Sequence, residues 1–190
     1  MDSAVPLLAI PLFIVAANIM NAGTISERLL KFCLALVGRF RGGLGHVNVV
    51  ANMIFAGMSG SAVADAVGLG KIIIEMMRKD NRYSAGYAAA ITAAASTIGP
   101  IIPPSIPMIL YGVSAEVSIG ELFIAGIGPG LLIGGALMLF VYLWCKYKGW
   151  GRNDGDGRLS LGRATLQAGW ALMMPVIILG GIYGGIFTPT

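Results

Sequence analysis

Charged side chains are scarce in this sequence: 13 Lys and Arg and 9 Asp and Glu make up 12% of 190 residues, against 56% hydrophobic residues. A typical globular domain carries about 25% charged residues. Five stretches have no charge at all, and each is as long as the roughly 20 residues that a helix needs to cross a bilayer. This scarcity excludes a secreted disulfide scaffold, a nucleic-acid binder and a cytosolic enzyme. The uncharged stretches are 3–26, 42–64, 83–115, 122–145 and 164–190.

Cysteine is also scarce, since the chain has only Cys33 and Cys145, both within hydrophobic segments. Their spacing fits neither a metal site nor a disulfide framework. We therefore expect both to pack as apolar side chains. The N-terminus has no basic region or small-residue cleavage site before its apolar run, so it is not a signal peptide. We expect residues 1–25 to form a transmembrane helix.

A single histidine limits the catalytic chemistry. Gly57-Met58-Ser59-Gly60 matches the Gly-x-Ser-Gly pattern of rhomboid-type intramembrane serine proteases, in which serine needs a histidine partner. His46 precedes Ser59 by about three and a half helical turns, roughly 20 Å, and no histidine follows it. We expect His46 to lie at the interface, and we predict no catalytic residue and no enzyme.

The basic residues form three clusters beside hydrophobic segments, within 28–41, 71–82 and 146–163. The connection 114–121 contains Glu116 and Glu121 and no basic residue. By the positive-inside rule, the three clusters are expected in the cytoplasm and the acidic connection outside. Residues 146–163 then form a cytoplasmic loop, and 26–41 forms an amphipathic helix in the cytoplasmic interface or a plain connecting helix.

Segment 42–80 has both ends on the cytoplasmic side in this topology, so it must enter the membrane and return. Its polar residues make it unsuited to face lipid on all sides, which favours a re-entrant helical hairpin turning at 58–61 and buried against protein. Two short complete spans are the alternative. The polar residues of the segment include Asn48, Asn52, Ser59, Ser61, Asp65 and Lys71.

Segment 83–113 contains four prolines between positions 100 and 107, so it cannot be one continuous helix. Proline lacks a backbone donor and clashes with the preceding turn. Carbonyl groups near 98–103 should therefore lose their helical partners about halfway through the membrane, where protein, water or a cation must satisfy them. The remaining spans, 122–145 and 164–187, contain Gly126-x-x-x-Gly130 and Gly181-x-x-x-Gly185, spacings typical of close helix packing.

These segments together predict an all-α, polytopic membrane protein with one re-entrant hairpin and one proline-broken helix. Serine hydroxyls and freed carbonyls are neutral, hard oxygen donors that suit a weakly held monovalent cation. If the hairpin tip around Ser59 and Ser61 meets the break at 99–104, the two would build one ion site. The alternative is that serine and glycine only permit a tight turn. Asp65 follows the tip by one turn and is expected to orient it, with Lys71 or the tip backbone as its partner.

Three runs resemble the DctM-like large membrane subunit of tripartite ATP-independent periplasmic (TRAP) transporters: FAGMSGSAVAD at 55–65, TIGPIIPPS at 97–105 and GIFTPT at 185–190. The resemblance covers nearly the whole chain. It implies that the chain forms one half of a fold like that of the ion-transporter superfamily, in a bacterial or archaeal inner membrane. It also implies two partners, a small membrane subunit and a periplasmic solute-binding protein, and sodium-driven import of organic anions such as C4-dicarboxylates or sialic acid by an elevator movement.

The resemblance further implies one sodium ion held by the hairpin tip and the broken helix, with sodium as coupling ion and no other cofactor. In this sequence that site maps onto Ser59, Ser61, Gly99, Ile102 and Pro104. Large subunits of the family are about twice this length and carry a second inverted repeat, so we expect the chain to be a piece of the first repeat. A membrane scaffold without its own transport site is the alternative, but a scaffold needs no interrupted helices.

Overall fold

The structure, a computed structural model, describes residues 11, 15, 25–150, 161–184 and 186. Within these residues all regular secondary structure is helical, which confirms the predicted all-α class. Among the described residues, two helices are long and apolar enough to cross a membrane: α8 (Ile119–Lys148) and α9 (Leu161–Tyr183), which contain 18-residue stretches with mean hydropathies of 2.1 and 1.6. At 1.5 Å per residue they measure about 45 and 35 Å, so each exceeds the roughly 30 Å hydrocarbon core of a bilayer.

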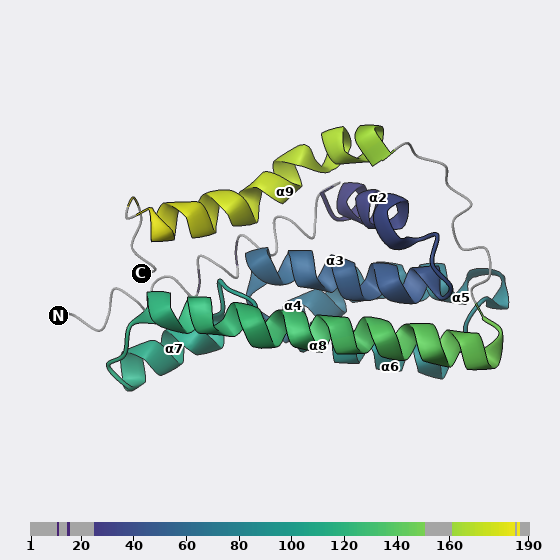
Figure 1. The fold of residues 1–190 in the computed structure, drawn as a ribbon, viewed down its shortest axis with the longest axis horizontal. Helices are drawn as coiled ribbons and strands as arrows, with labels where there is room; N and C mark the ends of the chain where they lie inside the picture. Colours follow the sequence, from purple (N-terminus) through teal and green to yellow (C-terminus); the bar gives the residue numbers. More distant parts are fainter. Residues whose placement is uncertain (1–10, 12–14, 16–24, 151–160, 185, 187–190) are drawn as a thin grey trace.

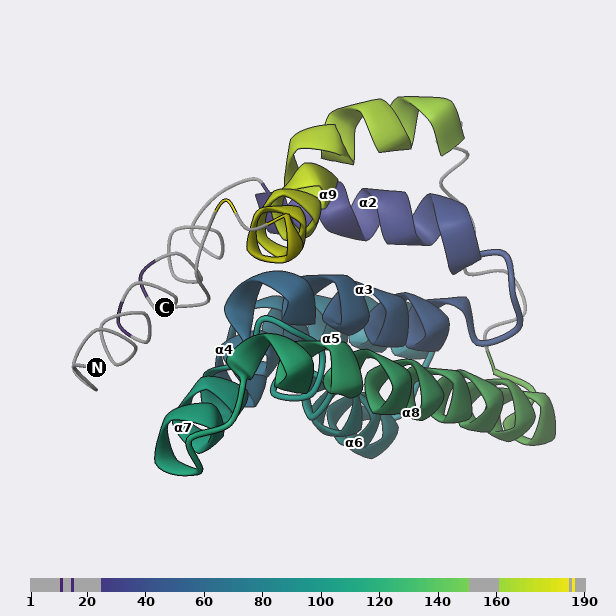
Figure 2. The same cartoon turned by 60° about the vertical axis from the view of Figure 1, so that its left-hand side comes forward.

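The helices lie in layers, with α3 between the upper and the lower ones. Figures 1 and 2 show α9 and α2 above α3, with α6, α7 and α8 below it. Large apolar side chains such as Leu29, Phe55 and Ile73 fill the space between α2, α3 and α5. The helices are α2 (Ile25–Val37), α3 (Gly43–Ser59), α4 (Ala62–Val67), α5 (Leu69–Arg78), the 3-10 helix η1 (Lys79–Asn81), α6 (Ala85–Ser96) and α7 (Ile106–Ser114).

Serine residues set the starts of four of these helices. Each serine side chain accepts a hydrogen bond from the backbone N–H three residues later, which satisfies one of the donors that a helix start leaves free. In this apolar sequence, four helices therefore begin at a serine cap and not at a charged residue. The pairs are Ser61 with Ala64, Ser84 with Tyr87, Ser105 with Met108 and Ser118 with Glu121.

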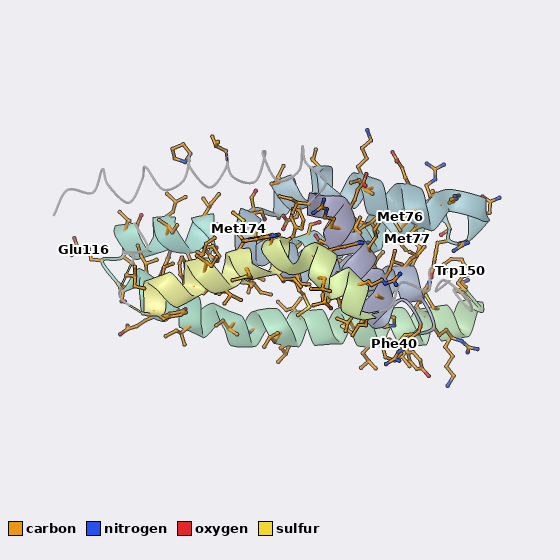
Figure 3. The ribbon with its side chains drawn as sticks, turned by 90° about the horizontal axis from the view of Figure 1, so that it is seen from above. Phe40, Met76, Met77, Glu116, Trp150 and Met174 are labelled. Carbon is orange, nitrogen blue, oxygen red and sulfur yellow. The ribbon has the colours of Figure 1, made fainter. Side chains whose placement is uncertain are left out.

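Helices α3, α4 and α5 form a hairpin that reverses at Gly60. This glycine has a φ of 59°, in the left-handed region that suits glycine. The hairpin's start at Gly42 lies against Cys145 near the end of α8, and the end of α5 shares a cavity with Trp150. Both ends of the hairpin are therefore at the same end of the bundle. Figure 3 shows Phe40 and Trp150 at that end and Glu116 at the opposite one.

The proline-rich segment between α6 and α7 packs on α8 at a row of glycines. A Cβ on Gly126 would lie 2.5 Å from the carbonyl oxygen of Ile101 in this segment. Farther along α8, a Cβ on Gly134 would lie 2.5 Å from the sulfur of Met53 on α3. Gly130 meets the side chain of Ile102 between them. The prediction that the 126/130 spacing marks close packing is confirmed.

Several sequence-based expectations concern residues at the edges of the description. Of the predicted span 1–25, the structure describes only residues 11, 15 and 25. Position 185 and residues 151–160 of the predicted loop 146–163 lie outside the described residues. Residues 146–148 end α8, and 161–163 begin α9. Cys33 and Cys145 are fully buried among apolar side chains, which confirms their packing role, and Cys145 Sγ also lies 3.5 Å from the Tyr87 hydroxyl.

Candidate functional site

The hairpin tip lies directly against the break between α6 and α7. The carbonyl oxygen of Gly60 accepts a hydrogen bond of 3.4 Å from the backbone N–H of Ile106. A Cβ on Gly60 would lie 2.6 Å from the carbonyl oxygen of Pro104, a contact that real side chains do not make. The approach of the two backbones therefore requires glycine at the tip. On the other side, Pro175 of α9 covers Gly57.

Ser59 and Asp65 form a buried pair within this tip. The Ser59 hydroxyl donates a hydrogen bond of 2.5 Å to Asp65 Oδ1 and accepts one of 3.3 Å from the backbone N–H of Ser61. Asp65 is 0% exposed. The expectation that Lys71 pairs with Asp65 is wrong, because Lys71 is exposed and the serine occupies Oδ1. The six-residue spacing lets the turn at Gly60 bring the serine back onto the following helix.

The second oxygen of Asp65 faces the break. Among the described residues, Asp65 Oδ2 has no hydrogen-bond partner although it is buried. It lies 2.6 Å from the position where a Cβ on Gly99 would be, so the absence of a side chain at Gly99 makes room for it. A buried charged oxygen without a partner is costly unless a cation or a proton compensates it.

The break is held open by a serine. Ser105 Oγ donates a hydrogen bond of 2.6 Å to the carbonyl oxygen of Pro100 and caps the start of α7. The carbonyl oxygen of Ile98 is also satisfied, by the N–H groups of the two isoleucines that follow the first proline. Among the described residues, the predicted loss of helical partners in 98–103 is therefore confirmed at Gly99, Ile101, Ile102 and Pro103, and is wrong at Ile98 and Pro100. Within the described ranges, the carbonyl oxygens of Gly99, Ile102 and Pro104 accept no hydrogen bond.

The structure brings some of the predicted site residues together and gives others a second role. Ser59 and Gly99 both face Asp65. Ser61 caps α4, with its hydroxyl accepting from the N–H of Ala64 at 3.4 Å. The side chain of Ile102 packs on α8, and the carbonyl of Pro104 lies against the tip glycine, so only the backbones of these two residues are available at the site.

A polar ladder that sequence reasoning missed joins α3 to α6 beside this site. We use this term for Asn48 and Asn52 on α3 with Thr92 and Ser96 on α6, all buried. Asn48 Nδ2 donates to Thr92 Oγ1 at 2.7 Å, and Asn52 Nδ2 donates to Asn48 Oδ1 at 2.9 Å. Ser96 Oγ then donates to Asn52 Oδ1 at 3.3 Å. The available signal was the four-residue spacing of both pairs, which places each on one helix face.

Comparison with known proteins decides the family. The family model described as "Tripartite ATP-independent periplasmic transporter, DctM component" matches residues 2–190. The chain belongs to the DctM family of TRAP transporters. The resemblance of the three sequence runs is thereby confirmed, and membership of this family implies a membrane protein, with which the two long apolar helices agree.

Relatives of this DctM chain include permeases named for different substrates. It is 48% identical over 185 residues to the sialic acid TRAP transporter permease protein SiaT of Haemophilus influenzae, covering 97% of the chain and 30% of the relative. It is 47% identical to the isethionate TRAP transporter permease protein DctMQ of Oleidesulfovibrio alaskensis, covering 97% and 29%. It is 46% identical to the C4-dicarboxylate TRAP transporter large permease protein DctM of Vibrio cholerae, covering 97% and 40%. The chain thus spans less than half the length of these relatives.

The protease alternative does not fit the geometry of this DctM chain. Ser59 is bonded to a carboxylate rather than to an imidazole. His46 lies thirteen positions earlier on the same helix, about 20 Å away, and packs edge-on against Phe40 with 5.9 Å between ring centroids. Within the described ranges, no three His, Cys, Asp or Glu residues come together as a metal site. The relatives are permeases, not enzymes.

Proposed function

We propose that this chain is part of the membrane subunit of a sodium-coupled secondary transporter that imports organic anions. Two observations support the substrate class. The chain belongs to the DctM family. Three relatives are named for sialic acid, C4-dicarboxylates and isethionate, and all three substrates are anions. In a tripartite system, a periplasmic solute-binding protein delivers the anion, and a small membrane subunit completes the complex in a bacterial or archaeal inner membrane.

The sodium site lies, in this proposal, between the hairpin tip and the break. The observation that carries it is the buried Asp65 Oδ2, which has no partner in the described residues and faces Gly99. The break also offers carbonyl oxygens at Gly99, Ile102 and Pro104 that accept no hydrogen bond from the described residues, and the proposal takes these as ligands. The ligands are these carbonyls together with the hydroxyls of Ser59 and Ser61.

The charge of the oxygen set favours a monovalent ion. Calcium sites use six to eight oxygens, typically with several carboxylates, and magnesium keeps much of its hydration shell. Here a single carboxylate, Asp65, accompanies neutral hydroxyls and carbonyls. One negative charge balances one sodium ion, and neutral donors hold the ion weakly enough to release it. Asp65 acts either as a direct ligand or by orienting Ser59.

The depth of the site fits a coupling role. Ile102 packs on Gly130, which is about 17 Å along the roughly 45 Å of α8. Pro175 of α9 covers the tip at Gly57, and Met174 precedes it in the chain. Figure 3 shows Met174 between the two ends of the molecule. Coupling-ion sites of transporters lie near the midplane, where discontinuous helices expose carbonyl groups.

Sodium would couple to transport because its oxygens come from two separate segments. An ion between the hairpin tip and the broken helix draws both segments into one geometry. An anion that binds beside this ordered tip would bind more tightly with sodium present, and by linkage sodium would bind more tightly with the anion present. The hairpin is re-entrant in this account, and the end with Arg39, Arg78 and Lys148 faces the cytoplasm.

The test is the sodium dependence of organic-anion uptake by the protein reconstituted with its two partners. Ser59→Ala removes one neutral oxygen worth roughly 1 to 2 kcal/mol, which raises the half-saturating sodium concentration roughly five- to thirtyfold. Because Ser59→Ala also removes the hydrogen-bond donor to Asp65, we expect the rise in the half-saturating sodium concentration to lie toward the upper end of this range. Uptake should recover partly at high sodium.

Ser118→Ala is the matched control, because Ser118 caps α8 far from the tip and supplies no ion ligand. It should leave the sodium dependence unchanged. An unaltered sodium dependence in Ser59→Ala would remove the ion site from the proposal. Uptake that never depended on sodium would remove the coupling itself and favour the scaffold alternative.

A further inference from the structure

An apolar groove runs between α6 and α8 toward the basic end of the molecule. It encloses about 700 Å³. On each helix, the side chains that line it recur at intervals of three or four residues, so the groove follows one face of each helix. We call this cavity the apolar groove; its walls include Tyr87, Ala90 and Ala94 on α6 and Leu137, Phe140 and Trp144 on α8.

The length of the apolar groove matches one leaflet of a bilayer. From Leu137 to its mouth at Lys148, it follows eleven residues of α8, or about 16 Å. Half of a 30 Å hydrocarbon core is about 15 Å. A membrane-buried groove of this length that opens at the interface has the dimensions of a single lipid chain.

A second cavity, the basic chamber, adjoins the mouth of the groove. It encloses about 790 Å³ and includes Arg78, Lys79 and Glu75 in its walls. Ser84 and Trp150 line both cavities, so the two adjoin each other at these residues. The chamber walls contain two basic side chains and one acidic one, and a third basic side chain, Lys148, lines the adjoining groove.

Aromatic rings separate the basic chamber from the apolar groove. Trp150 packs edge-on against Tyr87 with 5.5 Å between ring centroids, and Lys148 Nζ lies 5.8 Å from the ring centroid of Trp144. Tryptophan and tyrosine favour the headgroup level of a membrane. The order of surfaces is therefore cations outermost, aromatic rings next and apolar walls deepest, which is the order of polarity in an anionic phospholipid.

We propose that the basic chamber and the apolar groove bind one anionic phospholipid, with its phosphate among Arg78, Lys79 and Lys148 and one acyl chain between α6 and α8. Basic pockets between membrane helices on the cytoplasmic side are known sites for anionic headgroups. A helix from another subunit does not fit the groove: a cylinder about 10 Å wide and 16 Å long occupies roughly 1,250 Å³, against about 700 Å³. This inference does not rest on the proposed sodium site.

The groove can be tested by filling it at Gly86. This glycine lines the apolar groove, and a Cβ there meets nothing within 4 Å, so the branch point of Gly86→Leu starts in open space at the groove wall. Gly135→Leu is the matched control, because Gly135 on α8 also has open space and does not line the groove. Native mass spectrometry of the purified, delipidated protein exposed to phosphatidylglycerol or phosphatidylcholine measures the bound lipid.

We expect the unchanged protein to retain phosphatidylglycerol in preference to phosphatidylcholine. Gly86→Leu should lower that retention at least tenfold, and Gly135→Leu should not change it. Arg78→Gln with Lys148→Gln should abolish the preference for phosphatidylglycerol, whereas Lys31→Gln, an exposed charge on α2, should preserve it.

Three outcomes would overturn the proposal. Equal retention of both phospholipids would remove the headgroup site, and full retention in Gly86→Leu would remove the acyl-chain site. Displacement of the bound phosphatidylglycerol headgroup by millimolar inorganic phosphate, with no effect of Gly86→Leu, would assign the basic chamber to a soluble anion instead. Cross-linking of a cysteine at Ala90 to a partner subunit, with no lipid bound, would assign the groove to protein.

Discussion

Gly99→Ala is the substitution whose effect follows most directly from the contact between the tip and the break. The added Cβ would lie 2.6 Å from Asp65 Oδ2 and 3.2 Å from the backbone nitrogen of Ala62 and the carbonyl carbon of Ser61. The shortest contact is with the Asp65 carboxylate, which Ser59 holds in place, and the two backbone contacts at 3.2 Å are also tight, so a rotation of Asp65 alone would break its bond to Ser59 and leave the backbone crowded. The hairpin tip must move away from the break as a unit. Such overpacking typically costs 1 to 3 kcal/mol.

That cost should fall on sodium binding, because the displaced oxygens are those of the proposed site. A loss of about 1 to 3 kcal/mol corresponds to a roughly five- to 150-fold weaker sodium affinity. Sodium-dependent uptake in liposomes measures it. Maximal uptake should also stay low at saturating sodium, because excess ion does not remove the clash.

Gly128→Ala serves as the control for Gly99→Ala, since its Cβ would meet nothing within 4 Å on α8. It should behave like the unchanged protein in both sodium affinity and maximal uptake. If Gly99→Ala showed unchanged sodium affinity and unchanged maximal uptake, the reasoning from the close approach of Gly99 to Asp65 would be refuted.

Two further predictions concern the polar ladder and the topology. Thr92→Val keeps the side-chain shape but leaves the buried amide of Asn48 without its acceptor at 2.7 Å, so it should destabilise the protein by about 1 to 3 kcal/mol; thermal unfolding in detergent should show this, while the exposed Thr165→Val should change little. Single cysteines at Arg82 and Glu116, in a protein without its native cysteines, should react with membrane-impermeant reagent from the cytoplasm and the periplasm respectively. Periplasmic labelling at position 82 would contradict the re-entrant hairpin.

The all-helical class and the positions of the interruptions could be predicted from sequence because local chemistry determines them. The prolines from Pro100 to Pro107 remove helical donors wherever they occur, and the structure ends α6 at Ser96 and restarts helix at Ile106. Gly60 likewise marks the reversal of the hairpin because it adopts a positive φ. The meeting of tip and break at one point was a hypothesis that the contact between Gly60 and Pro104 now supports.

The partners of buried polar groups could not be predicted in the same way. Sequence reasoning offered Lys71 or the tip backbone as the partner of Asp65, but the turn brings the Ser59 hydroxyl onto Asp65 and leaves the lysine exposed. The polar ladder joins Asn48 to Thr92, which are 44 positions apart. Only the packing of α3 on α6 brings these residues together, and periodicity within one helix does not reveal its partner helix.

Equilibrium binding of radioactive sodium to the purified protein tests the central claim most directly, because it needs neither transport nor partners. The account predicts saturable sodium binding that potassium does not displace. Ser59→Ala should weaken this binding roughly five- to thirtyfold, and Ser118→Ala should leave it unchanged. Saturable sodium binding of the same affinity in Ser59→Ala and in the unchanged protein would contradict a sodium ion at the junction of the hairpin tip and the broken helix.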